Sequence, residues 1–166
     1  MLDEVDRKLI AELMQNARSP LAEIARRTGI PRTTLAERLD KLEKRGIIKG
    51  YRIDLNPRKL GFKYAAFVLV KVRRGEAGRV KPGQVALAEK IVRDCRKKEG
   101  MPWIEEVHIV TGEYDLLLKV WARRWDELTN FLIQYMPSLS DVVHTYTMLV
   151  LVTVHDESGL PPLEIK

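Results

Sequence analysis

Three segments of the chain are apolar at almost every position, namely AAFVLVKV (65–72), LLLKVW (116–121) and MLVLVTV (148–154). Strands that are apolar on both faces are typical of sheets that are buried on both sides. None of these segments approaches the roughly 20 apolar residues that a membrane-spanning helix needs. We therefore expect the chain to fold around a sheet with two faces to cover, and to have no membrane as a partner.

Two amphipathic helices are predicted between these strands. Apolar residues recur at i, i+3, i+7 and i+10 in residues 84–98 and again in residues 124–136. Their expected buried stripes are Val85, Ala88, Val92 and Cys95 in the first, and Trp125, Leu128, Leu132 and Tyr135 in the second. The strands are predicted at 63–72, 104–111, 116–121 and 142–154. This βαββαβ order indicates a ferredoxin-like domain over residues 62–154, with one sheet and two helices.

Two helices can cover only one face of such a sheet. The other face would leave a large exposed apolar patch, which in a soluble protein usually marks an interface. We therefore predict a homodimer that forms through the sheet of this C-terminal domain.

The stretch SPLAEIARRTGIPRTTLAERLDKLEKR (19–45) has the pattern of two helices around a tight turn. Ser19 is a good N-cap and Pro20 a good first helical residue. Gly29 can adopt the left-handed conformation that ends a helix and permits a sharp turn. Pro31 starts the next helix, whose apolar stripe is Leu35, Leu39 and Leu42. This is the pattern of a helix-turn-helix, in which the second helix enters the DNA major groove.

An earlier helix is expected to complete a three-helix core. Asp3 can cap it, and it ends near Asn16. Its apolar stripe comprises Val5, Leu9, Ile10 and Leu13. We therefore place a DNA-binding domain at residues 1–46, which makes the whole chain an α+β protein.

Positive charge is concentrated in this N-terminal part. Residues 26–52 hold nine Lys/Arg and three Asp/Glu, a net charge of +6 that equals the formal charge of the whole chain. A basic cluster on one helical unit favours double-stranded DNA as the partner. A helical hairpin whose basic face is merely solvated would show a similar pattern. The basic cluster therefore supports DNA binding only together with the helix-turn-helix motif.

The second helix offers two kinds of DNA contact. Near base edges we expect Arg32, Thr33, Thr34 and Glu37, because Arg pairs with guanine, Thr touches the thymine methyl group and Glu accepts from cytosine. Phosphate contacts are expected from Arg38, Lys41 and Lys44, and more weakly from Arg26 and Arg27. An alternative for Glu37 is an ion pair with Lys41 one turn along the helix. The order of preference is therefore Arg32 and Thr33 first and Glu37 last.

Residues 47–61 follow this domain. From Gly50 to Leu55 polar and apolar residues roughly alternate, which predicts a strand. Lys49 and Arg52 would reach phosphates if that strand formed a wing beside the DNA. A plain linker between the domains is an equally good interpretation.

The segments LDEVDRKLIAELMQNARSPLAEIARRTGIPRTTLAERLDKLEKRGIIKGY and EEVHIVTGEYDLLLKV resemble the Lrp/AsnC, or feast/famine, family of transcriptional regulators. The resemblance covers roughly residues 2–154. It implies a winged helix-turn-helix joined by a β linker to a ferredoxin-like domain called RAM. It also implies dimers, often assembled into tetramers or octamers, and an amino-acid effector bound between dimers.

By this resemblance, the effector region is the turn between the second and third RAM strands. Gly112, Glu113, Tyr114 and Asp115 match it. Gly112 would let a carboxylate approach backbone N–H groups, and Asp115 would hold an α-ammonium group. Thr145 and Thr147 lie on one face of the last strand and complete the candidate set. A plain hairpin turn with glycine in its usual place explains the same residues.

Two segments have no clear counterpart in the family pattern. Residues 73–101 hold a longer connection with extra Gly, Pro and basic residues, which is either a plain loop or an added interface. The tail, residues 155–166, contains Pro161-Pro162 and is hypothesised to be an arm over a neighbouring subunit.

Other functions find little support in the sequence. No metal-ligand spacing joins the three histidines, no Gly-rich phosphate loop is present, and Cys95 belongs to a buried stripe. We therefore expect no catalytic residue, no metal and no cofactor, and a cytoplasmic location. Two alternatives are an enzyme resembling the haem-pathway decarboxylases that share this layout, and an architectural protein that compacts DNA with little sequence preference.

Overall fold

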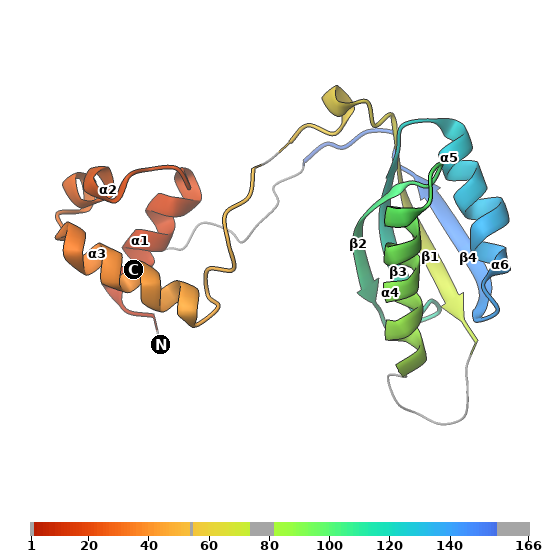
Figure 1. The fold of residues 1–166 in the computed structure, drawn as a ribbon, viewed down its shortest axis with the longest axis horizontal. Coiled ribbons are helices and arrows are strands. Elements are labelled where there is room, and N and C mark those ends of the chain that lie inside the picture. Colours follow the sequence, from red (N-terminus) through yellow and green to blue (C-terminus); the bar gives the residue numbers. More distant parts are fainter. Residues whose placement is uncertain (1, 54, 74–81, 156–166) are drawn as a thin grey trace. The chain divides into compact units, whose positions relative to one another are not determined.

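The computed structural model describes residues 2–53, 55–73 and 82–155 (Figure 1). The chain divides into two compact units with a boundary at residue 54. Among the described residues, the first holds residues 2–53 and His155, and the second holds residues 55–73 and 82–154. This boundary falls inside the predicted linker, residues 47–61. Each unit is described by itself below.

The N-terminal unit consists of three helices, α1 (Glu4–Gln15), α2 (Leu21–Thr28) and α3 (Arg32–Lys44). A capping box starts α1: the Asp3 side chain accepts from the Asp6 N–H, and the Asp6 side chain accepts from the Asp3 N–H. The core of the unit is a fully buried apolar cluster with members from all three helices, namely Leu9, Ile24, Leu35 and Leu42. The predicted three-helix core is therefore confirmed.

The turn between α2 and α3 also forms as predicted, because Gly29 adopts a left-handed conformation with φ of 71°. The start of α2 differs from the prediction. Pro20 is the N-cap, and the first helical residue is Leu21. Ser19 therefore lies one residue too early to cap the helix, and its hydroxyl instead accepts a hydrogen bond from Arg27 at 3.1 Å.

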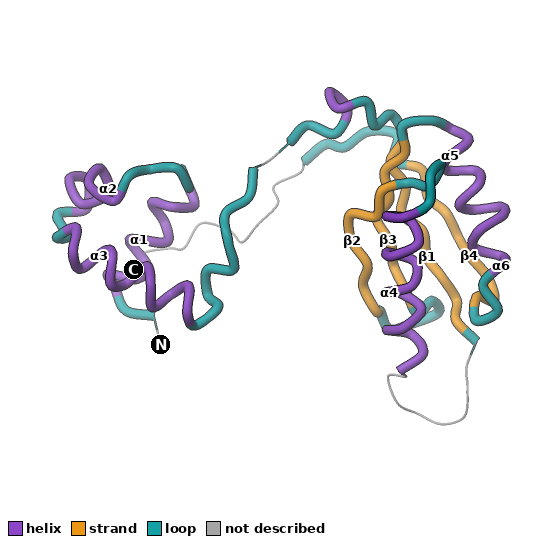
Figure 2. Tube along the Cα trace, viewed as in Figure 1, coloured by secondary structure: helices purple, strands orange, loops and turns teal. Residues whose placement is uncertain are grey.

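The predicted strand after α3 is not found: residues 47–53 contain no strand and are drawn as loop in Figure 2. A strand needs a neighbouring strand to pair its backbone groups. The described part of the N-terminal unit is entirely helical outside its loops and offers none. The side chains of Tyr51, Ile53 and Leu55 remain 49–76% exposed.

The C-terminal unit opens with a short helical turn, η1 (Arg58–Leu60), and then has the predicted βαββαβ order. Its strands are β1 (Tyr64–Val72), β2 (Trp103–Ile109), β3 (Leu116–Ala122) and β4 (Val142–Leu149). They form one antiparallel sheet in the order β2-β3-β1-β4. The first helix is α4 (Pro82–Lys97), and the second helical segment comprises α5 (Trp125–Thr129), η2 (Asn130–Tyr135) and α6 (Met136–Ser138).

Both helical segments pack against one face of the sheet. The core between them and the sheet is fully buried and includes Val68, Val70, Ile91, Leu116, Leu118 and Phe131. Since strand residues alternate between faces, Phe67, Leu69 and Leu117 point to the opposite face, where they stay partly exposed. The prediction that the helices cover only one face is therefore confirmed.

The predicted stripes are confirmed in part, because Cys95, Leu128 and Tyr135 are buried, but each helix presents a somewhat different face to the sheet. In α4 the buried residues are Leu87, Ile91 and Cys95, whereas Val85 is 42% exposed. In the second segment Trp125 is 50% exposed and Phe131 is fully buried. The second helix has a π-helical stretch at η2, and its wider turn changes which side chains meet the sheet.

The last strand is shorter than predicted and ends at Leu149 instead of Val154. Its partner β1 begins at Tyr64, and the final ladder contact is the Val150 N–H donated to the Ala65 carbonyl at 2.9 Å. Beyond that point no strand remains to pair with. Leu151, Val152 and Val154 are accordingly at least 75% exposed.

Candidate nucleic-acid interface and effector region

The exposed side of α3 carries the residues predicted to meet DNA. Arg32, Thr33, Glu37 and Lys41 are exposed, and Thr34 is partly buried. Arg32 is the first residue of the helix and follows directly on the Gly29 turn and Pro31. The first turn of α3 therefore presents a guanidinium and two hydroxyl groups next to the end of α2.

Several of these side chains have no competing contact. Within residues 2–53, no hydrogen bond or ion pair engages the side chains of Arg26, Arg32, Glu37 or Lys41. The alternative interpretation of Glu37, an ion pair with Lys41, is thus not found. Lys44 does pair, with Asp40 at 2.7 Å, although both groups are largely exposed.

Arg38 is placed differently from the other predicted phosphate contacts. Its Nη1 lies 2.5 Å from Asp3 Oδ2 and 3.4 Å from Asp6 Oδ1, so it joins α3 to the start of α1. The Asp6 backbone N–H and the Arg38 guanidinium together hold the pKa of the Asp3 carboxyl below its ordinary value. Arg38 is therefore already paired with acidic groups of its own chain.

Arg27 is engaged even more fully. Its Nε lies 2.7 Å from Glu12 of α1, and its Nη1 lies 2.5 Å from Glu23 of α2. Its Nη2 donates to the Ser19 hydroxyl. The contact with Glu12 joins α2 to α1, whereas those with Glu23 and Ser19 stay within α2 and the residues just before it. Sequence reasoning missed this role, because only the fold brings Glu12 and Arg27, fifteen residues apart, together.

In the C-terminal unit, the turn Gly112–Asp115 joins β2 and β3, and Asp115 is its most connected residue. Its carboxylate accepts from the Val72 backbone N–H at 2.9 Å and from the Gln84 amide at 3.1 Å. The Lys71 ammonium lies 3.5 Å from the same carboxylate. Asp115 therefore ties together the end of β1, the first turn of α4 and the turn itself.

The other predicted effector residues divide between the two faces of the sheet. Tyr114 stacks near His144 and Tyr146, with ring centroids 6.2 and 6.3 Å apart, on the face that the helices leave open. Thr145 and Thr147 pair in register with Val70 and Val68, whose side chains lie on the helix-covered face. Opposed residues of an antiparallel pair share a face, so the sheet separates these threonines from Tyr114.

Glu113 and Gly112 are exposed in the turn. Gly112 has φ of 120°, a conformation that favours glycine, and the Glu113 carbonyl accepts a hydrogen bond from Lys71. The six predicted residues thus form no single cluster: four share the turn and two lie across the sheet.

The open face of the sheet is apolar and aromatic. Its residues, placed by register, are Phe67, Leu69, Leu117, Trp121, Tyr146 and Met148. Tyr146 and Met148 are 51% and 42% exposed. The polar groups at its β2 side are paired: Trp121 donates its indole N–H to Glu105 at 2.7 Å, and Lys119 lies 3.0 Å from the same carboxylate.

Each of the two units matches a known protein family in sequence. Residues 2–49 match the winged helix-turn-helix DNA-binding family, and residues 65–160 match the Lrp/AsnC ligand binding domain. The chain is 35% identical over 164 residues to the HTH-type transcriptional regulator FL11 of Pyrococcus furiosus, covering 99% of this chain and 98% of that protein. The chain belongs to the Lrp/AsnC family.

Members from bacteria are also similar to this chain. The regulatory protein AsnC of Escherichia coli K12 is 31% identical over 151 residues, covering 91% of each protein. The structure of E. coli AsnC superposes with a TM-score of 0.77 at 26% identity, covering 97% of this chain and 99% of that one. A regulator from Neisseria meningitidis, solved with L-Met, has a TM-score of 0.81 at 24% identity and covers 97% of both chains, which shows the shared fold.

Membership in the Lrp/AsnC family makes the chain a transcriptional regulator with a DNA-binding unit and a ligand-binding unit. The described residues offer few groups suited to metal binding or to nucleophilic chemistry. Among the described residues, no cluster of three or more His, Cys, Asp or Glu is arranged to hold a metal ion. Burial raises the pKa of the Cys95 thiol to about 12, so this cysteine is a poor nucleophile. No described helix is both long and apolar enough to cross a membrane.

Proposed function

We propose that this Lrp/AsnC regulator binds double-stranded DNA sequence-specifically, with the first turns of α3 in the major groove. The observation that carries the proposal is the set of unengaged side chains on that face. Arg32 and Thr33, followed by Thr34 and lastly Glu37, are assigned to base edges. Arg26 and Lys41 are assigned to phosphates, with Lys44 as a weaker contact because Asp40 competes for it.

Arg27 and Arg38 have a different role in this proposal. Each is held by carboxylates of the N-terminal unit, Arg27 by Glu12 and Glu23, and Arg38 by Asp3 and Asp6. A phosphate must compete with these groups for the guanidinium. We therefore assign the two arginines to positioning α2 and α3 relative to α1, with any phosphate contact secondary.

The proposed assembly is a homodimer through the open face of the C-terminal sheet. The face exposes aromatic and aliphatic groups next to one another, which favours burial against an identical surface. A dimer would present two α3 helices to two half-sites of an operator. Sedimentation should show a dimer or a larger even-numbered assembly, and Leu69→Asp should shift it toward the monomer, whereas Lys90→Asp on the exposed side of α4 should leave it unchanged.

An amino acid or related small molecule is proposed as the effector, in line with the match to a ligand binding domain. We place it at the turn Gly112–Asp115, against Tyr114 and the backbone N–H groups. The Asp115 carboxylate has three contacts already, and Thr145 and Thr147 lie across the sheet. A thermal-shift screen against the amino acids should find a ligand whose stabilising effect is lost in Tyr114→Ala.

DNA binding itself is tested by its salt dependence. Affinity for the DNA upstream of the regulator's own gene should fall steeply as salt rises, because each neutralised phosphate releases counterions. A response that is flat with salt would contradict DNA binding. Equal affinity for unrelated DNA at the same salt concentration would instead identify an architectural, sequence-independent binder.

A further inference from the structure

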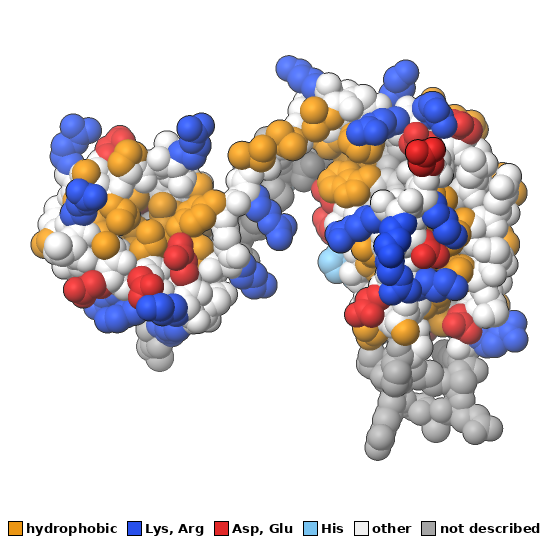
Figure 3. Space-filling view, in the orientation of Figure 1, with side chains coloured by type: hydrophobic (Ala, Val, Ile, Leu, Met, Phe, Trp, Pro, Cys, Tyr) orange, Lys and Arg blue, Asp and Glu red, His pale blue; other side chains and the backbone are white. Residues whose placement is uncertain are grey.

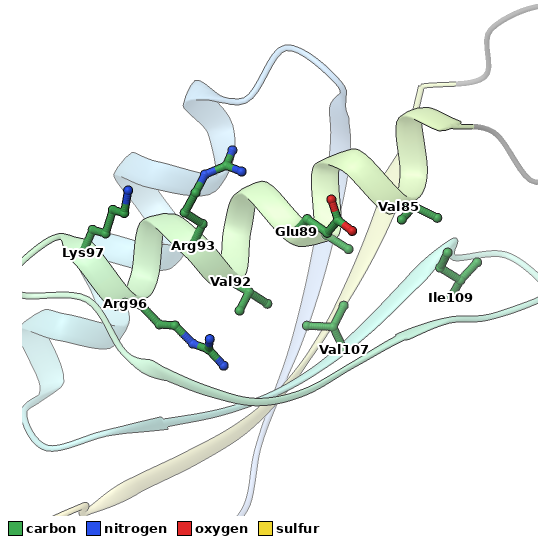
Figure 4. A pocket seen from close by; sticks show the side chains of 9 residues that line it. Val85, Glu89, Val92, Arg93, Arg96, Lys97, Val107 and Ile109 are labelled. Atoms are coloured by element: carbon green, nitrogen blue, oxygen red, sulfur yellow. The ribbon is translucent and has the colours of Figure 1, made fainter. Parts of the chain in front are cut away.

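A groove of about 600 Å³ lies between α4 and the edge strand β2 of the C-terminal unit (Figure 4). Its apolar lining comes from both elements and consists of Val85, Ala88, Val92, Val107 and Ile109. Val85 and Ile109 are 42% and 41% exposed, so the described part of the chain leaves this aliphatic floor open to solvent. Small-molecule sites are mostly apolar and measure roughly 300–1,000 Å³, and this groove has that size and lining.

One guanidinium group reaches into the groove near the C-terminal end of α4. Figure 4 shows Arg96 pointing from the helix toward the β2 side, beyond Val92. Arg93 and Lys97 project from the other side of the helix in the same view. No described residue forms a hydrogen bond or an ion pair with the Arg96 side chain. The groove thus has one unpaired positive charge at one end of an aliphatic floor.

The two acidic residues of α4 leave this end of the groove positive. Asp94 accepts a hydrogen bond from the Tyr135 hydroxyl at 3.0 Å and lies 3.7 Å from the Lys98 ammonium. Glu89 lines the groove but precedes Arg96 by seven residues, which corresponds to about 10 Å along the helix. An anionic group is therefore favoured beside Arg96 and disfavoured midway along the groove.

A second copy of the same groove is a poor occupant. Residues 90–98 hold five Lys/Arg and one Asp, and Figure 3 shows Lys and Arg side chains gathered over α4. Two α4 helices packed together would bring these like charges into contact, which disfavours such an interface. The tail of the chain, residues 156–166, lies outside the described residues and is no part of the proposal. The charges instead favour a separate anionic molecule.

We propose that the groove binds an amphipathic monocarboxylate, with its carboxylate on Arg96 and its hydrocarbon chain along the aliphatic floor. A guanidinium can hold a carboxylate through two parallel hydrogen bonds, and burial of the chain removes apolar surface from water. Val85 precedes Arg96 by eleven residues, about 16 Å along the helix, so the floor is long enough for a medium-chain acid. A single guanidinium on the groove side matches a ligand with a single anionic group.

This site differs from the amino-acid site proposed at the turn Gly112–Asp115. That turn is connected to the first turn of α4, where the Gln84 amide donates to the Asp115 carboxylate at 3.1 Å. Arg96 lies twelve residues further along the same helix than Gln84, which corresponds to about 18 Å. The inference therefore goes beyond the proposed function and does not depend on the amino-acid effector or on DNA.

Isothermal titration calorimetry of the full chain with decanoate tests the carboxylate contact. Binding should saturate, and decylammonium, which has the same chain length and the opposite charge, should bind at least roughly tenfold more weakly. Arg96→Glu should weaken decanoate binding roughly tenfold, because a hydrogen-bonded ion pair is replaced by repulsion. Lys90→Glu makes the same charge change on α4 without lining the groove, so this matched control should keep the wild-type affinity.

Methyl NMR spectra test where the hydrocarbon chain lies. Decanoate should shift the methyl signals of the aliphatic floor, namely those of Val85, Val92, Val107 and Ile109. The signals of Leu69, on the open face of the sheet, should stay unchanged. Val85→Glu changes an exposed residue, so the protein should remain folded while the new charge weakens decanoate binding.

Three results would overturn the proposal. The first is the absence of saturable decanoate binding, and the second is an equal affinity of wild type and Arg96→Glu. The third is a set of methyl shifts confined to the open face of the sheet. Sedimentation of Arg96→Glu without ligand adds a further check: a change in the size of the assembly would identify the groove as a contact between protein chains and would overturn the ligand site.

Discussion

The exposed face of α3 and the turn between β2 and β3 both hold charged residues that the sequence marks as functional, but the fold uses them in opposite ways. On α3, the side chains of Arg32 and Lys41 make no hydrogen bond or ion pair within the described residues of their unit. In the turn, Asp115 is bound to a backbone N–H, an amide and an ammonium group. A charged side chain with no partner in its own unit is available to bind another molecule. One that is already hydrogen-bonded or ion-paired within the unit stabilises the fold instead.

The largest effect is expected from Asp115→Ala. This change leaves the Val72 N–H and the Gln84 amide without their acceptor, and hydrogen bonds to a charged group contribute most to stability. We expect the free energy of unfolding to fall by about 3 kcal/mol, measured by urea denaturation. Glu113→Ala, two residues earlier in the same turn, removes an exposed carboxylate and should change stability by less than about 0.5 kcal/mol. If Asp115→Ala instead kept its stability and lost only the response to an amino acid, Asp115 would be a ligand contact.

Arg32→Ala tests the other side of the comparison. Because the Arg32 side chain makes no hydrogen bond or ion pair within residues 2–53, we expect little change in stability and a loss of base discrimination of about 1–3 kcal/mol at one operator position. Competition between the operator and single-base variants measures this loss. A uniform weakening on every variant would reassign Arg32 to a phosphate.

The neighbouring residues Arg26 and Arg27 form a matched pair. Arg26→Ala should weaken binding to all sequences alike and reduce the slope of log affinity against log salt by about one, since it removes one phosphate contact. Arg27→Ala should mainly lower the free energy of unfolding, by about 1 kcal/mol, because its ion pairs with Glu12 and Glu23 are partly exposed. Titrations at several salt concentrations and urea denaturation of both variants separate the two effects. If the two variants behave alike, ion pairing with Glu12 and Glu23 does not determine which of the two arginines contacts DNA.

Local patterns in the sequence predict most of the fold. The Asp3 cap, the Gly29 turn and the βαββαβ order depend on neighbouring residues or on periodicity, and all three are confirmed. The predicted stripes were right only in part: Cys95, Leu128 and Tyr135 are buried, whereas Val85 and Trp125 are exposed. In the second helix the π-helical turn of η2 departs from the 3.6-residue period on which the prediction was based.

Contacts between distant residues could not be predicted in the same way. The pairing of Arg38 with Asp3 spans 35 residues, and that of Asp115 with Val72 spans 43. In the sequence, Arg38 is indistinguishable from Lys41 as a basic residue on one helix. Likewise, alternation showed that Thr145 and Thr147 share a face, but only the register of β4 on β1 shows that this face is the helix-covered one.

The smallest expected effect is on the pH dependence of stability, through Asp3. The Asp6 N–H and Arg38 lower the pKa of the folded Asp3 carboxyl, so the unfolded chain binds the proton more tightly. The stability that this group contributes is therefore present above its unfolded pKa, about 3.9, and is lost as the pH falls through the lower folded value. Asp3→Asn keeps a good N-cap and removes only the charge. Wild type should then be the more stable protein at neutral pH, and urea denaturation at a series of pH values should show the difference disappearing in acid. A difference that persists unchanged to the lowest pH would mean that Asp3 acts through its shape, and that the ion pair with Arg38 does not hold α3 in place.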